Sequence, residues 1–405
     1  MGILDLGILD LGILEFLRPK KLNKVKKMKI QKISAKSDFN ALCAKLKVHK
    51  MGKKIMSEKK ELHFFLIKEI SLAAINILKQ DALSCGAEVL SPENAVLGGK
   101  ELSRAVLIAN EKQLKSLEKK EALQDFGLKE LSRYLKLEFP NTKISPNPEI
   151  MGVLNMTDDS FNPKSRVDEK SIANRASQMI ESGASWLDIG AASTRPDSVY
   201  IGARAEFERV KSAVDILKSS NIAKKAKLSI DTFDENCAKY ALENGITLLN
   251  DISANTALAK IASEYGAKYC LMHGGIKGSS EPVNGDIIEL VDEFFERKIK
   301  ECENVGLKRE NIILDIGIGF GKSHEQGLVL IKNLEHFLRF GCELLVGASR
   351  KSIINAYHPS SVENRLAGTL FLHQKAIENG ASIIRVHDSL EHAQLLALHS
   401  AYKAL

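Results

Sequence analysis

Eight short apolar runs between residues 150 and 386 each contain near their end, or are followed within three residues by, a polar residue able to do chemistry. Segments with helical spacing fill the intervals between the runs. Eight alternating strand and helix units predict a (β/α)8 barrel, in which the carboxyl ends of all strands meet at one face and carry the active site. The sequence therefore predicts the fold class and the location of a site together. The runs are Ile150–Leu154, Trp186–Ile189, Leu228–Ile230, Thr247–Leu249, Lys268–Met272, Ile312–Leu314, Leu344–Val346 and Ile383–Val386.

Three polar residues near the ends of the third, fourth and sixth runs suit the recognition of a flat ligand. Asp231, Asn250 and Asp315 would meet in one barrel mouth. Carboxylates accept hydrogen bonds from ring N–H and amino groups, and an amide both donates and accepts, so the set fits a planar heterocycle with an amidine-like edge. The alternative is that each residue caps the helix that follows it, because Asp and Asn are favoured N-caps.

A glycine-rich turn follows the sixth run and reads DIGIGFGK from Asp315 to Lys322. Its alternating glycines allow positive φ angles and a close approach of the backbone to a flat ligand. Their spacing differs from those of the dinucleotide-binding and Walker motifs. A tight strand-to-helix turn would also use glycines, but the aspartate directly before them favours a ligand-binding role.

Basic residues follow the last two runs, where barrels of this kind often bind phosphate. Arg385 and His387 are two residues apart, so we expect both side chains on one face of the last strand, in the mouth. A guanidinium can bind a phosphate through two hydrogen bonds. The alternative for Arg385 is a structural ion pair with Asp388 or Glu391.

Two polar segments follow the first two runs, at residues 155–161 and 193–196. Loops over a barrel mouth can close on a substrate and exclude water. Asn155, at the end of the first run, could supply a neutral oxygen to Mg²⁺ beside a diphosphate, because Mg²⁺ takes few protein ligands in such sites.

The chain has 405 residues, more than the roughly 250 that a barrel needs. Residues 1–27 form a five-residue repeat followed by a basic cluster. The repeat matches no helix or strand period, so we expect a disordered extension, and a weak membrane-surface anchor, apolar then basic, is the alternative. Residues 28–147 predict a small α/β domain, with strands near 61–67 and 105–109 and helices near 71–84, 113–117 and 128–137. The barrel is expected over residues 148–405.

Composition favours a cytoplasmic protein that acts on small molecules. Residues 1–147 contain 28 Lys and Arg against 17 Asp and Glu, whereas the rest of the chain is slightly acidic. A solvated lysine face is the favoured interpretation, and contact with nucleic acid or a membrane surface is the alternative. The six cysteines are scattered, which is typical of reduced thiols, and no apolar stretch reaches membrane-spanning length.

At these residues the sequence resembles dihydropteroate synthase, of the pterin-binding barrel family, over about residues 148–392. Departures are Asp158 and Ile316, where the family usually has proline, and Ala191 and Ala192, where it usually has Gly-Glu. The usual glycine-rich continuation after residue 161 is also missing. The matching motifs are Met151–Thr157, Asp188–Gly190, Ser193–Pro196, Ser229–Thr232, Asn250–Asp251, Leu271–His273, Asp315–Lys322, Ser349–Ser352 and Arg385–Asp388.

The resemblance implies an enzyme that condenses dihydropterin-6-ylmethyl diphosphate with 4-aminobenzoate, is a target of sulfonamides, uses Mg²⁺ and forms a homodimer. Asp231, Asp315, Lys351, Arg385 and His387 would carry the catalysis. The contacts that it implies are the pterin for Asp231, Asn250, Asp315 and Lys351, the diphosphate for Thr194, Arg195, Arg385 and His387, Mg²⁺ for Asn155, and 4-aminobenzoate for Phe320, Ser349 and Arg350.

Two other functions are compatible with the same barrel. A methyltetrahydrofolate-dependent methyltransferase would need the pterin contacts but no diphosphate site, and the basic residues after the last two runs weigh against it. A non-catalytic pterin-binding protein would need no intact set of strand-end residues. The sequence provides no catalytic constellation in residues 28–147, so the role of that region stays open.

Overall fold

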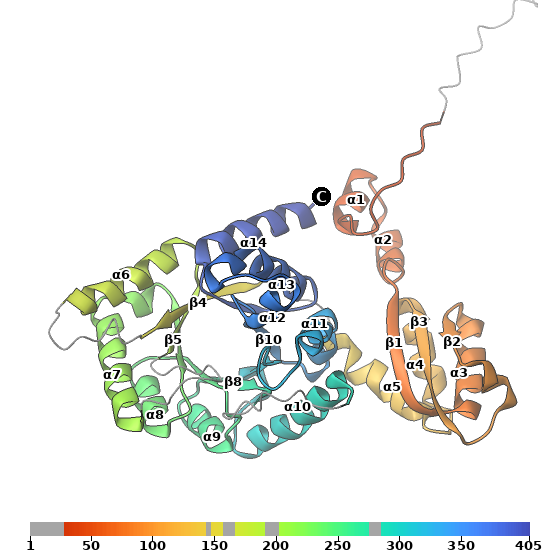
Figure 1. Cartoon of the computed structure of the whole chain (residues 1–405). Helices are drawn as coiled ribbons and strands as arrows, with labels where there is room; N and C mark the ends of the chain where they lie inside the picture. Colours follow the sequence, from red (N-terminus) through yellow and green to blue (C-terminus); the bar gives the residue numbers. More distant parts are fainter. Residues whose placement is uncertain (1–27, 143–146, 157–166, 191–201, 275–284) are drawn as a thin grey trace, which may run out of the picture.

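The structure is a computed structural model of the whole chain, and it describes residues 28–142, 147–156, 167–190, 202–274 and 285–405. The extension expected over residues 1–27 lies outside this range. The rest of the chain forms a closed eight-stranded barrel and, beside it, a smaller region built on a separate sheet (Figure 1). This architecture confirms the predicted fold class.

The smaller region contains a three-stranded antiparallel sheet with the strand order β1-β3-β2. Apolar residues from the sheet and from helices α3, α4 and α5 form its core. Gly86, at φ 80°, ends α3, and Asn110 begins α4 in a capping box with Gln113. The elements are α1 (Phe39–Lys45), α2 (Lys50–Ser57), β1 (His63–Ser71), α3 (Leu72–Cys85), β2 (Glu88–Leu90), η1 (Glu93–Leu97), β3 (Leu102–Ala109), α4 (Glu111–Glu121), α5 (Leu128–Leu137) and η2 (Phe139–Thr142).

All eight apolar runs form parallel strands of the barrel, which closes through β9, β10, β11 and β4. Each strand is nearly continuous in apolar residues because both of its faces are buried, one against the interior and the other against helices. The strands are β4 (Glu149–Asn155), β5 (Trp186–Gly190), β6 (Lys227–Asp231), β7 (Leu248–Asp251), β8 (Lys268–Met272), β9 (Ile312–Asp315), β10 (Glu343–Val346) and β11 (Ile383–Val386).

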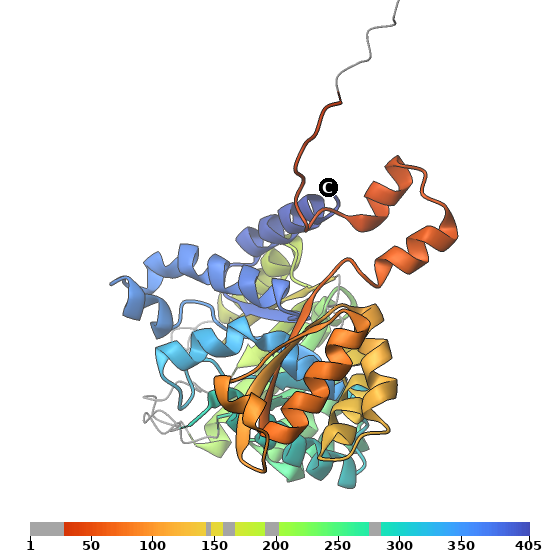
Figure 2. The same cartoon turned by 90° about the vertical axis from the view of Figure 1, so that its right-hand side faces the viewer.

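Helices surround the barrel on its outer side (Figures 1 and 2). A separate apolar cluster that includes Met151, Trp186, Leu248 and Ile313 fills part of the barrel interior, so the barrel is packed rather than hollow at this level. The helices are α6 (Val167–Glu181), α7 (Ala203–Ser219), η4 (Ile222–Lys224), α8 (Glu235–Glu243), α9 (Thr256–Glu264), α10 (Ile287–Asn304), η5 (Arg309–Asn311), α11 (His324–Lys332), η6 (Leu334–Phe340), α12 (Ser352–Tyr357), η7 (Val362–Arg365), α13 (Leu366–Glu378) and α14 (Ser389–Lys403).

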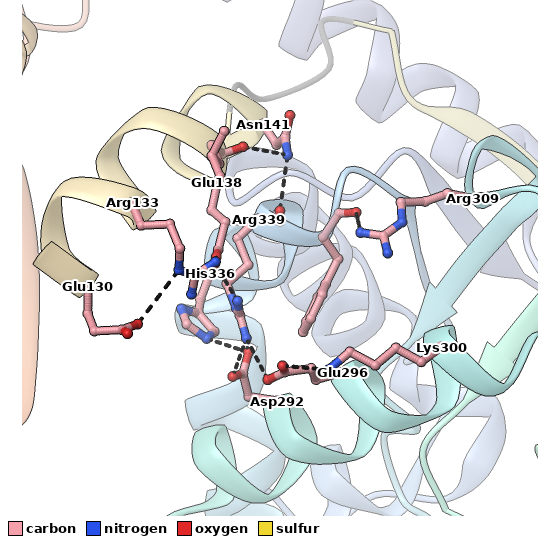
Figure 3. A network of polar contacts seen from close by, with 12 residues as sticks. Glu130, Arg133, Glu138, Asn141, Asp292, Glu296, Lys300, Arg309, His336 and Arg339 are labelled. Atoms are coloured by element: carbon pink, nitrogen blue, oxygen red, sulfur yellow. Dashed lines mark hydrogen bonds and ion pairs between the residues drawn. The ribbon is translucent and has the colours of Figure 1, made fainter. Parts of the chain in front are cut away.

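A network of charged residues joins the smaller region to the barrel (Figure 3). Arg339, in η6, donates to both carboxylate oxygens of Asp292 at 2.9 and 2.6 Å and also pairs with Glu138, at the end of α5. Asn141 donates to the carbonyl of Arg339 at 3.1 Å. A second contact joins Lys68 to the start of α10 through an ion pair of 2.6 Å with Asp286. A cleft of about 2570 Å³ lies at this interface.

Replacing Arg339 by alanine is expected to weaken this interface, because its side chain is only 13% exposed and the carboxylates of Asp292 and Glu138 would each lose one of their partners. The expected loss of stability is about 3 kcal/mol, the cost of removing one member of a buried ion pair. Hydrogen exchange of the α5 amides would show faster opening. Arg297→Ala is the matched control, because that arginine is 62% exposed and its pair with Glu301 is worth little. Equal exchange in both variants would contradict the prediction.

All six cysteines are free thiols, as their scattered positions predicted. Within the described ranges, no helix is both long enough and apolar enough to cross a membrane.

Candidate active site

The strand register places the predicted polar residues at one level of the barrel rim. Asn155 is paired with Gly190, Gly190 with Asp231, and Asp231 with Asn250. Residues paired in this way in a parallel sheet project to the same face, so these side chains share the mouth. Asp188 lies two residues before Gly190 and therefore projects inward one layer deeper.

Arg385 is the centre of the site. Its Nε donates to Asp188 Oδ2 at 2.6 Å, and its Nη2 donates to Asp231 Oδ2 at 2.9 Å. Both carboxylates are buried, so the guanidinium neutralises charge that water cannot reach. Burial raises the pKa of Asp231 to about 7, although the charge of Arg385 opposes the shift. Ionisation of Asp231 therefore depends on Arg385.

Several oxygens in the mouth have no hydrogen-bond partner among the described residues. They are Oδ1 of Asp188 and Oδ1 of Asp231, together with Oγ of Ser229. Asn250 donates to Asp188 Oδ2 at 3.0 Å, which fixes the orientation of its amide. Unpartnered buried acceptors are costly, and a ligand with N–H groups would satisfy them.

Asp315 reaches the same mouth from β9. Its Oδ1 accepts from the backbone N–H of Gly317 at 2.8 Å, and burial raises the pKa of this carboxyl. The helix-capping alternative is wrong for all three polar residues at the strand ends. The N-caps of the helices that follow are Asp234, Asn255 and Ser323 instead.

Lys351 lies opposite the carboxylates. Its ammonium donates to the carbonyl of Ile318, and its Nζ is 4.7 Å from the centre of the Phe320 ring, a cation–π distance. Burial lowers the pKa of Lys351 to about 8, and the nearby carboxylates of Asp315 and Asp231 oppose that shift. The lysine is therefore a half-buried cation in contact with a ring and a carbonyl and near two acids.

Lys322 holds the glycine turn in place. Its Nζ donates to three carbonyl oxygens, those of His273 at 2.9 Å, Gly317 at 3.1 Å and Phe320 at 3.0 Å. The turn approaches β8 so closely that a Cβ at Gly317 would lie 2.0 Å from the carbonyl oxygen of His273. Burial lowers the pKa of Lys322 to about 7. The glycine is therefore required by close packing as well as by its φ of 64°.

Lys322→Met is expected to lower the free energy of unfolding by about 2 kcal/mol, because three carbonyls lose a buried donor. Urea unfolding at pH 7 measures the change. Lys332→Met, at the exposed end of α11, is the control and should be neutral. The pKa of Lys322 is lower in the folded chain than its usual 10.5, so the unfolded chain binds more protons between pH 7 and 10.5. Lys322 therefore contributes stability that increases as pH rises through that window, and the Met variant should lose this contribution.

Ser349 and His387 meet at the outer edge of the mouth. Ser349 Oγ is 2.9 Å from His387 Nδ1 and accepts from the His387 N–H at 3.3 Å. Arg385 forms its ion pairs with Asp188 and Asp231, so the suggested pairing with Asp388 or Glu391 is wrong. Asp388 pairs instead with Arg350, whose Nε donates to Asp388 Oδ2 at 3.0 Å.

Asn155 ends β4 at the rim. A Cβ on the neighbouring Gly190 would lie 3.1 Å from Asn155 Oδ1, so the glycine leaves room for that oxygen. Ile316 is fully buried and belongs to the apolar core, which accounts for a hydrophobic residue at this departure from the family pattern. Thr194 and Arg195, together with the departures at Asp158, Ala191 and Ala192, lie outside the described residues.

Sequence reasoning assigned no role to two residues of the site. Asp188 was noted only as part of the second apolar run and of a matching motif. A carboxylate in the middle of a buried strand is itself a signal of a functional residue, because charged side chains are rarely buried without a partner. Lys322 was recognised only as the last residue of the glycine motif. Its contacts depend on carbonyls from two different strand ends, which no local pattern reveals.

Comparison with known proteins identifies the relatives of this barrel. The family model described as pterin binding enzyme matches residues 151–387. A bifunctional dihydropteroate synthase/dihydropteroate reductase of Helicobacter pylori is 40% identical over 378 residues, which is 91% of this chain and 97% of that protein. The dihydropteroate synthase of Clostridium beijerinckii is 35% identical and matches 64% of this chain and 96% of its own length.

Solved structures of dihydropteroate synthases are also similar to this chain. The dihydropteroate synthase of Clostridium difficile, determined in the presence of pteroic acid, has a TM-score of 0.59 at 32% identity and matches 64% of this chain and 98% of that one. The Xanthomonas albilineans enzyme in complex with 7,8-dihydropteroate has a TM-score of 0.56 at 26% identity and matches 64% and 94%. The match of the family model over more than half of the chain and the similarity to these relatives show that the chain belongs to the pterin-binding enzyme family.

Proposed function

We propose that the chain is a dihydropteroate synthase, which joins 7,8-dihydropterin-6-ylmethyl diphosphate to 4-aminobenzoate. The observation that carries this proposal is the group formed in one mouth by the buried residues Asp188, Asp231 and Asn250 with the half-buried cations Arg385 and Lys351. Two carboxylate oxygens of this group have no hydrogen-bond partner among the described residues. A pterin presents ring N–H and amino donors on one edge and a carbonyl on the other. The carboxylates would accept from the first edge, and Lys351 would donate to the second.

In the reaction, the C–O bond to the diphosphate breaks, a C–N bond to the aminobenzoate forms, and the arylamine releases a proton. An arylamine is a weak nucleophile, so loosening of the C–O bond ahead of attack is favoured. Asp231 and Asp315 would stabilise positive charge that spreads over the pterin ring. Arg385 and His387 would bind the departing diphosphate, with Thr194 and Arg195 from the second loop. Phe320, Ser349 and Arg350 would frame the aminobenzoate.

Mg²⁺ is compatible with the residues present. Among the described residues there is no cluster of three or more His, Cys, Asp or Glu that could hold a metal. A site that depends on one protein oxygen, waters and substrate phosphates needs no such cluster. Asn155 Oδ1, in the space that Gly190 leaves, would be that oxygen. When bound, the ion would neutralise charge on the diphosphate.

Diphosphate release tests the proposal when it is measured with each substrate alone and with both. Synthase activity requires release only when the two substrates are present together. Pterin binding without release would support a non-catalytic binding protein. Methyl transfer that depends on a corrinoid protein would support the methyltransferase alternative.

A second activity, reduction of dihydropteroate, is favoured by the extent of the similarity. The match to the bifunctional H. pylori protein covers 91% of this chain, whereas the match to the C. beijerinckii synthase covers only 64%. The additional part of the match includes the region of β1–β3, which the structure places beside the barrel (Figure 1). We therefore propose that this region belongs to a reductase function.

The reductase step adds a hydride and a proton to 7,8-dihydropteroate and gives the 5,6,7,8-tetrahydro product. The hydride must come from a reduced nicotinamide or a reduced flavin. The test is incubation of the full chain with 7,8-dihydropteroate and each donor, with the tetrahydro product measured by chromatography. Synthase turnover without any reduction by either donor would contradict the second activity and leave the first intact.

The division of the chain at residues 27 and 147, the homodimeric state and the cytoplasmic location stay predictions. Light scattering of the full chain measures the oligomeric state directly. Turnover by a chain that begins at Met28 would test whether residues 1–27 are dispensable.

A further inference from the structure

The turn that carries Ser349, Arg350 and Lys351 has an unusual backbone. Arg350 has a φ of 56°, in the left-handed region that side chains other than glycine rarely adopt. Such a conformation persists only where the surrounding structure holds it, and it is common at functional sites. The neighbours on both sides of Arg350 project toward the proposed substrates. The contacts that hold this turn therefore determine where those side chains lie.

One side of α13 supplies these contacts. Arg365, Thr369 and His373 are spaced four residues apart, so they lie in a row on the helix. Arg365 Nη1 donates to the Arg350 carbonyl at 3.0 Å, and Thr369 Oγ1 accepts from the Arg350 N–H at 2.9 Å. His373 Nε2 accepts from the Ala348 N–H at 3.0 Å. Three backbone groups of the turn thus have side-chain partners.

The hydroxyl of Thr369 both donates and accepts a hydrogen bond. It donates to the carbonyl of Arg365 at 2.8 Å while it accepts from Arg350, and the side chain is completely buried. Because the side chain is buried, no water can replace this acceptor if it is removed. The Arg350 N–H would then be left without a hydrogen bond, which would destabilise the turn.

A second histidine fixes the proton positions of the first. His373 Nδ1 is 2.8 Å from His392 Nε2, and His392 Nδ1 is 2.6 Å from the Asp388 carbonyl. The Ala348 N–H can only donate and the Asp388 carbonyl can only accept. His373 must therefore carry its proton on Nδ1 and donate to His392 Nε2, and His392 must also carry its proton on Nδ1. Both rings are fully buried, and burial lowers the pKa of each.

The contacts of His373 and His392 lead back to Arg350 through Asp388. Asp388 accepts from His392 through its carbonyl and from Arg350 Nε through its carboxylate, at 3.0 Å. The turn is therefore held from α13 on one side and from the start of α14 on the other.

We infer that Arg365, Thr369 and His373, with His392 behind them, are positioning residues that set the turn of residues 348–351 and so place Ser349 and Lys351 for substrate. None of the four is expected to touch substrate. The inference rests on the proposed synthase function, which supplies the substrates used in its test.

Thr369→Val in the full chain tests the inference by removing the acceptor while keeping the shape of the side chain. The KM values for both substrates are expected to rise about tenfold, the equivalent of one lost hydrogen bond at the turn. Thr369→Ser keeps the hydroxyl and should stay within about twofold of the parent chain. Thr247→Val is the control, because that hydroxyl donates to the carbonyl of Leu228, at the opposite end of the barrel.

A purely structural role would lower the melting temperature and the active fraction but leave both KM values unchanged. That result, or a Ser variant as impaired as the Val variant, would overturn the inference. If the parent chain shows no turnover, the proposed function fails instead.

A second measurement needs no activity and no variant at position 369. In ¹⁵N-histidine spectra of the full chain between pH 6 and 7.5, His373 and His392 should both be neutral with the proton on Nδ1. His373→Gln and His392→Asn assign the signals. A proton on Nε2 of His373, or a charged ring at pH 6, would overturn the arrangement even if Thr369→Val does not fold.

Discussion

Arg385→Ala is expected to lower the free energy of unfolding by about 3 kcal/mol, because the buried carboxylates of Asp188 and Asp231 would lose their shared cation. The same change should reduce kcat/KM by about ten- to 150-fold, which corresponds to the roughly 1.5–3 kcal/mol of one charge-assisted contact with substrate. Urea unfolding and steady-state rates measure the two effects. Stability equal to that of the parent chain would contradict the ion-pair geometry.

The pH dependence of the free energy of unfolding provides a second test of the pairing between Arg385 and Asp231. The pKa of Asp231 is raised to about 7 in the folded chain, so the folded state binds more protons than the unfolded state between the ordinary value near 4 and 7. Its contribution to stability is therefore lost as pH rises through that window. Without the guanidinium, the pKa of Asp231 should rise further. The stability difference between the variant and the parent chain should grow from pH 4 to pH 8, and Arg385→Lys should recover part of it.

Lys351→Ala is expected to weaken binding of the pterin diphosphate by about 2 kcal/mol, close to thirtyfold, and to lower turnover with it. The ammonium is the group that would donate to the pterin carbonyl, and it lies 4.7 Å from the centre of the Phe320 ring and near the carboxylate of Asp315. Calorimetry of pterin diphosphate binding, alongside rates, is the measurement. Aminobenzoate affinity should fall only on the pterin-loaded enzyme, because the pterin would form part of that second site.

The exposed lysine at position 332 is the control, and Lys332→Ala should behave like the parent chain. The pKa of Lys351 is lowered to about 8, so the ammonium is present below pH 8 and lost above it. Pterin affinity of the parent chain should therefore decline as pH rises through 8, and that decline should be absent from the alanine variant. Parent-like affinity and rate in Lys351→Ala would leave pterin binding to the carboxylates alone.

The fold could be predicted from the sequence because parallel strands buried on both faces produce apolar runs that are visible without any long-range information. Each run ends at the same face of the barrel, so the residues that follow Ile230, Leu249 and Leu314 could be placed in one mouth. The smaller α/β region was also predicted, because its strands and capped helices are local patterns.

The partners of those residues were decided only by the tertiary structure. Arg385 and Asp188 are 197 residues apart in sequence but 2.6 Å apart in space, and no local period connects them. The same holds for Lys322, whose three carbonyls come from two strand ends, and for Arg350, which pairs with Asp388 where the sequence suggested Arg385. The sequence determined which residues reach the mouth, because strand periodicity is local. Barrel closure decided which charges meet there, because it alone brings distant strands into contact.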